Sequence, residues 1–190
     1  MVDWSFARVD SIMDEVIFDE QQIKRRVSEL GTEITDKYNG EPLLIIGVLR
    51  GAFIFMADLI RSIDLPIAVD FMLVSSYGER KNSSGVVRIV KDTKENIFDR
   101  HVLIVEDIVD TGYTYNSLKK TLQTREPASL RVCSLLNKKI NRKVEVDVDF
   151  YGFESPDEFL VGYGLDYLEY HRECPFIFKP TEEALNQLEE

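Results

Sequence analysis

The stretch VLIVEDIVDTGYTYNSL, residues 102–118, joins acidic side chains to a small-residue turn that runs into a helix. Gly112 in this turn lets the backbone come close to a ligand. The backbone amides of residues 111–114, with the hydroxyl groups of Thr111 and Thr114, can converge on one anion at the N-terminus of the helix. The turn therefore predicts a site for a phosphate monoester.

Three carboxylates precede this turn. Glu106 and Asp107 follow the apolar run 102–105, where we expect a buried strand to leave its sheet, and Asp110 comes three residues later. Adjacent strand residues point to opposite faces, so the first two carboxylates do not duplicate each other. Carboxylates accept hydrogen bonds from a ribose diol and can hold a hydrated magnesium ion that bridges to it. Together with the turn, they predict a ribose 5-phosphate site.

Other interpretations of this stretch explain less of it. An acidic turn in which Asp110 only caps the helix leaves Glu106 and Asp107 unexplained. A signalling receiver domain carries an acidic pair near its N-terminus, whereas the first apolar run here ends in GVLRG. A P-loop nucleotidase is disfavoured because the sequence has no Gly-Lys-Ser/Thr loop. The sequence also lacks a GxGxxG motif after a strand.

Strand and helix patterns alternate along the chain. Helically spaced apolar residues predict a helix over 19–40, with Asp19 as its N-cap and Gly40 as its end. Apolar runs predict strands at 42–49, 66–77, 86–91, 102–105 and 129–137, short strands within 148–153 and 159–167, and helices at 52–63 and 115–125. Residues 78–85 are rich in Gly, Ser and charge, which indicates a flexible hairpin loop. This order predicts an α/β fold with a largely parallel sheet, whose ligand edge lies at the carboxyl ends of the strands.

Composition narrows the class of protein. A chain of 190 residues favours a single domain, 1–190. Its net charge of -11 argues against binding to nucleic acid or to an anionic membrane surface. Cys133 and Cys174 form no CxxC motif and are expected to be reduced, buried thiols. The N-terminus lacks the features of a signal peptide, and no apolar run is long enough to span a bilayer, so we expect a cytoplasmic protein.

The quoted residues also resemble a known family. VLIVEDIVDTGYTYNSL is similar to the 5-phosphoribosyl-1-pyrophosphate signature of type I phosphoribosyltransferases. LLIIGVLRGAFIFMADLIR, VSSYG, CSLLNKK and VDFYGFESPDEFLVGYGLDYLEYHR resemble the hypoxanthine (hypoxanthine-guanine) branch, and the matches run in the family's order from about 40 to 178. The resemblance implies the type I fold, a mainly parallel sheet flanked by helices. It also implies a small hood built from the N-terminal segment and about 150–190.

The resemblance implies a reaction in purine salvage. Magnesium-dependent transfer of the 5-phosphoribosyl group from 5-phosphoribosyl-1-pyrophosphate to hypoxanthine, and to guanine, would give the nucleoside monophosphate and pyrophosphate. Glu106 and Asp107 would hold the ribose hydroxyls and a first Mg²⁺, and Asp110 would handle the proton at nitrogen 7 of the purine. The 5′-phosphate would be wrapped by Thr111, Gly112, Tyr113 and Thr114.

The family pattern also assigns residues to the purine and the pyrophosphate. Lys138 would donate to the 6-oxo group, and because an ammonium has only donors, it would not pair with the 6-amino group of adenine. Phe159 would stack on the base, and the backbone of Leu160 would read its edge. Asp166 would hold a second Mg²⁺, and Arg172 would contact the pyrophosphate.

Two loops complete the implied site. Leu49, Arg50 and Gly51 match the pyrophosphate loop of the family, in which the first peptide bond is often cis. Ser76 and Tyr77 match a mobile loop that closes over the reacting atoms and excludes water. Arg50 stands where many relatives have Lys, and Tyr113 where some do, so the side-chain roles at these two positions are open.

Two alternatives remain. A xanthine-guanine phosphoribosyltransferase would share most of these motifs, although DEFLVGYGLDY favours hypoxanthine and guanine. A transcription regulator that binds the phosphoribosyl group without catalysis would need a basic surface, which the charge of -11 disfavours. Retention of Asp110, Lys138 and Asp166 favours the enzyme. The resemblance further implies a homodimer or homotetramer.

Overall fold

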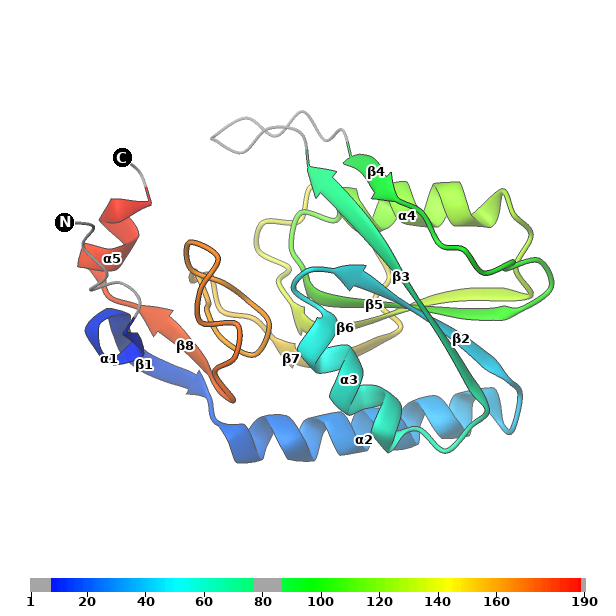
Figure 1. Cartoon of the computed structure of the whole chain (residues 1–190), viewed down its shortest axis with the longest axis horizontal. Helices are drawn as coiled ribbons and strands as arrows, with labels where there is room; N and C mark the ends of the chain where they lie inside the picture. Colours follow the sequence, from blue (N-terminus) through cyan, green and yellow to red (C-terminus); the bar gives the residue numbers. More distant parts are fainter. Residues whose placement is uncertain (1–7, 77–86, 189–190) are drawn as a thin grey trace.

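Figure 1 shows the computed structural model, which describes residues 8–76 and 87–188. Its main sheet has six strands in the order β4-β3-β2-β5-β6-β7. The strands are β2 (Leu43–Leu49), β3 (Ile67–Ser76), β4 (Val87–Lys91), β5 (His101–Val109), β6 (Ser129–Asn137) and β7 (Phe150–Glu154). Every neighbouring pair is parallel except β3 and β4. The predicted α/β fold with a largely parallel sheet is confirmed.

Helices cover both faces of this sheet. Leu43 and Ile45 of β2 pack in one core with α2 (Glu20–Tyr38) and α3 (Phe53–Ser62). Leu44 and Ile46 point the other way, into a second core with α4 (Tyr113–Gln123). Figure 1 shows α2 and α3 below the sheet and α4 above it. This double burial explains why β2 is a continuous apolar run rather than an alternating one.

The long helix α2 has well-defined ends. The Asp19 side chain accepts from the backbone amide of Gln22 at 2.8 Å, and the Gln22 side chain accepts from the amide of Asp19 at 2.8 Å. This reciprocal pair is a capping box, and it confirms Asp19 as the N-cap. The predicted end at Gly40 was late. The helix ends at Tyr38, because Asn39 takes the left-handed conformation with φ 48°.

A second, small sheet pairs the two ends of the chain. It consists of β1 (Met13–Phe18) and β8 (Ile177–Pro180), which run antiparallel and are flanked by α1 (Val9–Ile12) and α5 (Glu182–Gln187). Figure 1 shows it at the left, with segment 155–176 in orange between it and the main sheet. Within the described residues, Val161 bonds to Phe178 of β8 through both backbone groups, at 3.0 and 2.9 Å. The small sheet thus anchors segment 155–176.

The strand predicted within 159–167 was wrong. These residues form only isolated bridges, because Gly162, Tyr163 and Gly164 have φ of 103°, 50° and 104°. Consecutive residues in the left-handed region cannot continue a strand.

The predicted end of β5 was also wrong, and this changes the position of the acidic pair. Pairing of β5 with β2 stops at Val105, but pairing with β6 continues through Glu106 and Ile108 to Val109. Glu106 and Asp107 therefore lie inside a strand that is held on one side only, not after its end. The following helix begins at Tyr113, two residues before the prediction, with Gly112 as its N-cap at φ 86°.

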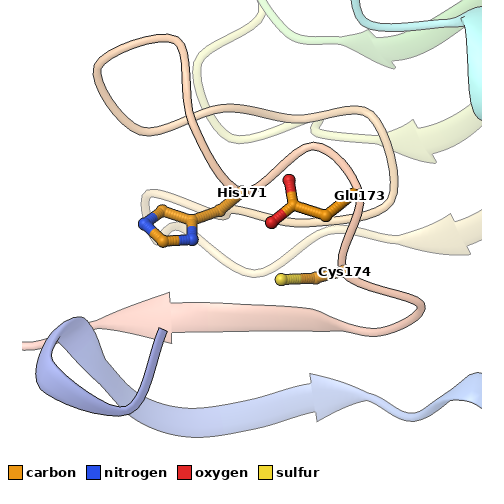
Figure 2. Close-up of side chains that lie close together, drawn as sticks. All are labelled: His171, Glu173 and Cys174. Atoms are coloured by element: carbon orange, nitrogen blue, oxygen red, sulfur yellow. The ribbon is translucent and has the colours of Figure 1, made fainter. Parts of the chain in front are cut away.

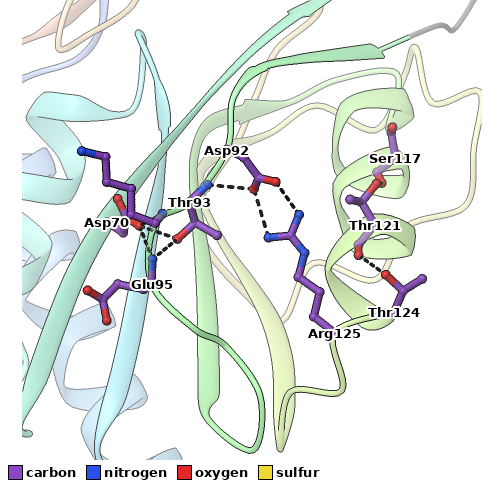
Figure 3. Close-up of polar contacts among 9 residues, drawn as sticks. Asp70, Asp92, Thr93, Glu95, Ser117, Thr121, Thr124 and Arg125 are labelled. Carbon is purple, nitrogen blue, oxygen red and sulfur yellow. Dashed lines mark hydrogen bonds and ion pairs between the residues drawn. The ribbon is translucent and has the colours of Figure 1, made fainter.

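The chain after β4 is fixed at two points (Figure 3). The Asp70 carboxylate accepts from the Thr93 hydroxyl and from the amides of Lys94 and Glu95, the amide distances being 2.6 and 3.0 Å. Asp92 forms an ion pair with Arg125, which follows α4.

Backbone pairing of Ser76 with Val87 confirms the hairpin between β3 and β4, while its predicted loop lies outside the described residues. None of the helices in the described ranges is both long and apolar enough to cross a bilayer.

Candidate active site

Three adjoining cavities lie where the parallel strands end. The turn cavity, about 320 Å³, is lined by the acidic residues of β5 and the turn after it. The Lys138 cavity, about 400 Å³, lies between the end of β6 and segment 155–176. The Arg172 cavity, about 620 Å³, lies between that segment and the ends of β2 and β3. Asp110 lines the first two, Asp166 the last two, and Leu49 and Arg50 the first and third.

Most of the predicted site residues line these cavities: Leu49, Arg50, Glu106, Asp107, Asp110, Thr111, Gly112, Thr114, Lys138, Phe159, Leu160, Asp166 and Arg172. Gly51 lines none of the three cavities, but it packs against Asp107, which lines the turn cavity. Tyr113 is half-buried in the first turn of α4 and does not line them either. The backbone of Ser76 ends β3, and Tyr77 lies outside the described residues.

The turn after β5 presents free backbone donors. The amides of residues 111–114 have no acceptor among the described residues, and those of 112–114 stand at the start of α4, where no preceding helical turn supplies one. Thr111, Gly112 and Thr114 line the turn cavity. A helix N-terminus with free amides attracts negative charge. These amides are compatible with an anionic ligand, and binding of a phosphate group at this turn stays a prediction.

Two of the three carboxylates beside this turn have an oxygen without a partner among the described residues. Glu106 Oε1 and Asp110 Oδ1 are buried and have no hydrogen-bond partner there. Burial, and next the charge of Asp107, raise the pKa of Glu106 well above its usual value. Burial also raises the pKa of Asp107, although backbone hydrogen bonds and Arg172 oppose the shift. Carboxylates in this state fit a ligand that brings hydroxyl donors or a divalent cation.

Close backbone packing brings the loop after β2 to this acidic pair. A Cβ atom on Gly51 would lie 1.6 Å from Asp107 Oδ2, so a larger residue there would have to displace the Asp107 carboxylate. A Cβ atom on Gly164 would lie 2.0 Å from the carbonyl oxygen of Gly51. The peptide bond between Leu49 and Arg50 is cis. The loop is thus packed between β5 and segment 155–176.

The Lys138 cavity combines a buried ammonium with an aromatic ring. Lys138 is only 8% exposed, and its Nζ lies 3.1 Å from the Glu158 carbonyl oxygen and 3.2 Å from Asp157 Oδ1. Phe159, in contrast, is 43% exposed and lines the same cavity. Lys139 has an exposed side chain that pairs with Glu154 at 2.6 Å. Of the two neighbouring lysines, only Lys138 faces the site.

The Arg172 cavity contains a network that the sequence did not predict. Arg172 donates to the Gly164 carbonyl at 2.8 Å and pairs with Asp166 at 2.8 Å and with Glu169 at 3.3 Å. The other Glu169 oxygen lies 2.6 Å from Arg50. Hydrogen bonding to Arg172 lowers the pKa of Glu169. The sequence did offer one signal for Glu169, namely its position three residues before Arg172 in EYHR.

A further cluster lies against the small sheet, apart from these cavities (Figure 2). Single ligand atoms of His171, Glu173 and Cys174 all lie within 4.8 Å of one another. Burial and the charge of Glu173 raise the pKa of Cys174, which favours the thiol over the metal-binding thiolate. The His171 ring packs edge-on against Phe178, with ring centroids 6.4 Å apart. Both cysteines of the chain are free and buried, as predicted.

Comparison with known proteins identifies the family. The phosphoribosyl transferase domain family matches residues 14–168. Hypoxanthine phosphoribosyltransferase of Haemophilus influenzae is 48% identical over 168 residues, covering 87% of this chain and 94% of the relative. Hypoxanthine-guanine phosphoribosyltransferase of Dictyostelium discoideum is 49% identical over 174 residues, covering 90% and 97%.

Solved structures agree with the sequence matches. The crystal structure of a hypoxanthine phosphoribosyltransferase from Staphylococcus aureus superposes with a TM-score of 0.87 at 43% identity, covering 90% of this chain and 93% of that one. The enzyme of Trypanosoma cruzi gives 0.89 at 40% identity, with coverage of 94% and 96%. The chain therefore belongs to the phosphoribosyltransferase family and groups with its hypoxanthine phosphoribosyltransferases, as its motifs predicted.

Proposed function

We propose that this protein is a purine-salvage enzyme that transfers the 5-phosphoribosyl group from 5-phosphoribosyl-1-pyrophosphate to hypoxanthine and guanine. The products are the nucleoside monophosphate and pyrophosphate. The observation that carries the proposal is the sharing of Asp110 between two cavities. One contains a phosphate-binding turn, and the other contains a buried ammonium and an exposed ring. A base and a ribose 5-phosphate can meet only at such a junction.

The turn cavity would bind the ribose 5-phosphate part of both donor and product. Free amides at the start of α4 and the hydroxyl groups of Thr111 and Thr114 would hold the phosphate. Tyr113 would contribute its amide, since its side chain does not line the cavity. Glu106 and Asp107 would accept hydrogen bonds from the ribose hydroxyls.

Asp110 would handle the proton of the reaction. As purine nitrogen 9 bonds to ribose carbon 1, the bond from that carbon to pyrophosphate breaks, and Asp110 accepts the proton from nitrogen 7. The ribose carries positive charge in the transition state, which the carboxylates of Glu106 and Asp107 would stabilise in their ionised form. The unpartnered Asp110 Oδ1 supports this role, because it is available to a proton donor.

Magnesium fits the donor set of this site. Glu106 and Asp107 on one side and Asp166 on the other would hold Mg²⁺, which prefers carboxylate and water oxygens. Glu106 Oε1 has no partner among the described residues, and burial and then the charge of Asp107 raise the pKa of this carboxyl; both support a cation site, because a nearby cation would favour the ionised form. When bound, Mg²⁺ neutralises charge on the departing pyrophosphate.

The Lys138 cavity would select the base. Two donors of the Lys138 ammonium are taken by Glu158 and Asp157, which leaves one for a purine 6-oxo group. Phe159 would stack on the ring, and the backbone of Leu160 would read its edge. Adenine should be rejected, because its 6-amino group would leave a buried ammonium facing a donor.

The remaining predicted residues would bind the pyrophosphate and close the site. Arg172, Arg50 and the backbone of Leu49 and Gly51 would contact pyrophosphate, and Ser76 and Tyr77 would belong to the closing loop. The resemblance supports a cytoplasmic homodimer or homotetramer. Size-exclusion chromatography with light scattering measures the assembly.

A side-by-side assay tests the function. The protein is given 5-phosphoribosyl-1-pyrophosphate, Mg²⁺ and one of hypoxanthine, guanine, xanthine or adenine. We expect inosine and guanosine monophosphate from the first two bases and no product from adenine. Faster use of xanthine than of hypoxanthine would instead support the xanthine-guanine alternative. No product with any base would contradict the proposed function, and the regulator alternative would then be tested by DNA binding.

A further inference from the structure

Arg142 reaches back from segment 142–146 to the end of β5. Its Nε donates to the Asp110 carbonyl at 2.8 Å, and its Nη2 donates to the Val109 carbonyl at 3.1 Å. Nη2 also donates to Asn137 Oδ1 at 2.8 Å, and Nη1 to the Val146 carbonyl at 3.2 Å. One guanidinium therefore joins the end of β5, the end of β6 and its own segment.

The same segment also donates hydrogen bonds to the next carbonyl group of the turn, that of Thr111. The amides of Lys143 and Val144 donate to the Thr111 carbonyl at 3.0 and 3.1 Å. A Cβ atom on Gly112 would lie 2.7 Å from the Val144 carbonyl and 3.2 Å from Arg142 Cδ. Three consecutive carbonyls, of residues 109–111, are thus bound to this segment, while the amides of residues 111–114 have no acceptor within residues 8–76 and 87–188. The segment thus holds the turn by its carbonyl groups, while Thr111, Gly112 and Thr114 line the turn cavity.

Arg142 lies outside the lining of the turn, Lys138 and Arg172 cavities. It also connects two of them, because the Val109 carbonyl that it contacts accepts the amide of Lys138 at 3.0 Å. Any effect of Arg142 on the reaction must therefore pass through the backbone that it holds.

We propose that Arg142 is a positioning residue that fixes the phosphate-binding turn and the backbone of Asp110 relative to the purine cavity. The inference rests on the proposed function, which assigns the turn to the 5′-phosphate. A guanidinium suits the task because its planar fork presents several donors in fixed directions. A lysine ammonium at the end of a flexible stem cannot reach acceptors on both strands and its own segment at once.

The test compares Arg142→Lys and Arg142→Ala with Lys143→Met. Lys143 is exposed and contributes its amide rather than its side chain to the turn, so its variant is the matched control. We expect kcat/KM for 5-phosphoribosyl-1-pyrophosphate to fall by about 10- to 100-fold in both Arg142 variants, as for a displaced reacting group. KM for hypoxanthine should change by less than about threefold. The control should behave like the wild type.

Two further measurements separate positioning from general support of the fold. Guanidinium ion added to Arg142→Ala should restore part of the activity, which it would not do if the variant were merely unstable. Direct calorimetric binding of ribose 5-phosphate should weaken in both variants. This measurement needs no catalysis, so it tests the turn even if no base is a substrate. Unchanged ribose 5-phosphate affinity, or an equal loss for both substrates that follows the loss of thermal stability in Arg142→Lys, would overturn the proposal.

Discussion

The Asp110 side chain is placed by its neighbours rather than by its own contacts. Its backbone carbonyl is bound to Arg142, while its Oδ1 atom is buried without a partner in the described part of the chain. An unpaired buried carboxylate oxygen costs stability, so it indicates a group kept for a ligand. Lys138 shows the opposite arrangement, because its ammonium is partly satisfied by Glu158 and Asp157.

Replacing Asp110 by Asn removes the proton acceptor while keeping the size of the side chain. We expect kcat to fall by about 10²- to 10⁴-fold, the usual contribution of general acid–base catalysis. The thermal unfolding midpoint and KM for 5-phosphoribosyl-1-pyrophosphate should change little. Steady-state kinetics and calorimetry measure these effects. Near-normal turnover would rule out the assigned role.

Replacing Lys138 by Ala should act on the base alone. Loss of a charged hydrogen bond worth about 1.5–3 kcal/mol should raise KM for hypoxanthine by roughly 10- to 100-fold. KM for 5-phosphoribosyl-1-pyrophosphate should stay within about threefold of the wild type. Lys139→Ala is the matched control, because that side chain is exposed and pairs with Glu154. An equal rise for both substrates would contradict a contact with the purine.

At the scale of elements, the chain that follows the edge strand β4 is held by Asp70 of β3. Burial raises the pKa of the Asp70 carboxyl, but hydrogen bonds from Thr93 and from the amides of Glu95, Phe71 and Lys94 outweigh it and lower the pKa to about 2. The unfolded chain binds a proton at this carboxyl near pH 3.8. Its ionised form therefore stabilises the folded state above that pH, and this stability is lost as the pH falls toward 2.

Asp70→Asn should lower the free energy of unfolding by about 1.5–3 kcal/mol at pH 7, because the charged carboxylate accepts hydrogen bonds from Thr93, Lys94 and Glu95. The difference between wild type and variant should shrink between about pH 4 and pH 2, where the wild-type carboxylate becomes protonated. Urea unfolding at several pH values gives both quantities. A difference that stays constant down to pH 2 would show that charge at Asp70 does not matter.

Sequence patterns predicted the strands whose side chains are buried on both faces of the sheet. They missed the strands, and parts of strands, that form only because a partner strand lies beside them. The strand over 129–137 was predicted with its observed bounds, because its apolar residues and flanking turns are local signals. The extension of β5 through Glu106 to Val109 depends on β6, which only the fold brings beside it. The short, mixed sequence MDEVIF of β1 gave no signal, because its strand forms against residues 177–180 at the other end of the chain.

The site residues divide in the same way, into those with a local sequence signal and those that depend on contacts made in the fold. Glu106, Asp107 and Asp110 lie within one motif, and their residue types alone indicated ribose and magnesium. Lys138 and Phe159 are unremarkable by type, and only the family pattern selected them. Arg142 and Glu169 were missed, because their roles depend on which backbone and side-chain groups meet them in space.

At the scale of the whole molecule, an ion-pair network spans the gap between the main sheet and segment 155–176. Glu169 pairs with Arg50, which follows β2, and with Arg172 of its own segment. All three side chains line the Arg172 cavity. In the proposed function, the pyrophosphate of the donor would compete with Glu169 for both arginines.

Glu169→Gln should therefore improve binding of the donor. KM for 5-phosphoribosyl-1-pyrophosphate should fall by up to about fivefold, a small effect because the Glu169 and Arg50 side chains are exposed. The effect should shrink as salt is added, since salt screens such pairs. Glu173→Gln is the control, as Glu173 is an exposed acid outside that cavity. A rise in KM would show that Glu169 supports the arginines rather than competing for them.

The pairing of β1 with β8 also has a consequence for how the protein is made. A ribosome releases the chain from its N-terminus, so β2, β5, the turn after β5 and Lys138 emerge before residues 177–180. Val161, next to the residues assigned to the base, takes its backbone partners from Phe178 of β8. A nascent chain can therefore form the turn proposed to bind phosphate first, whereas the wall that would select the base must wait for β8.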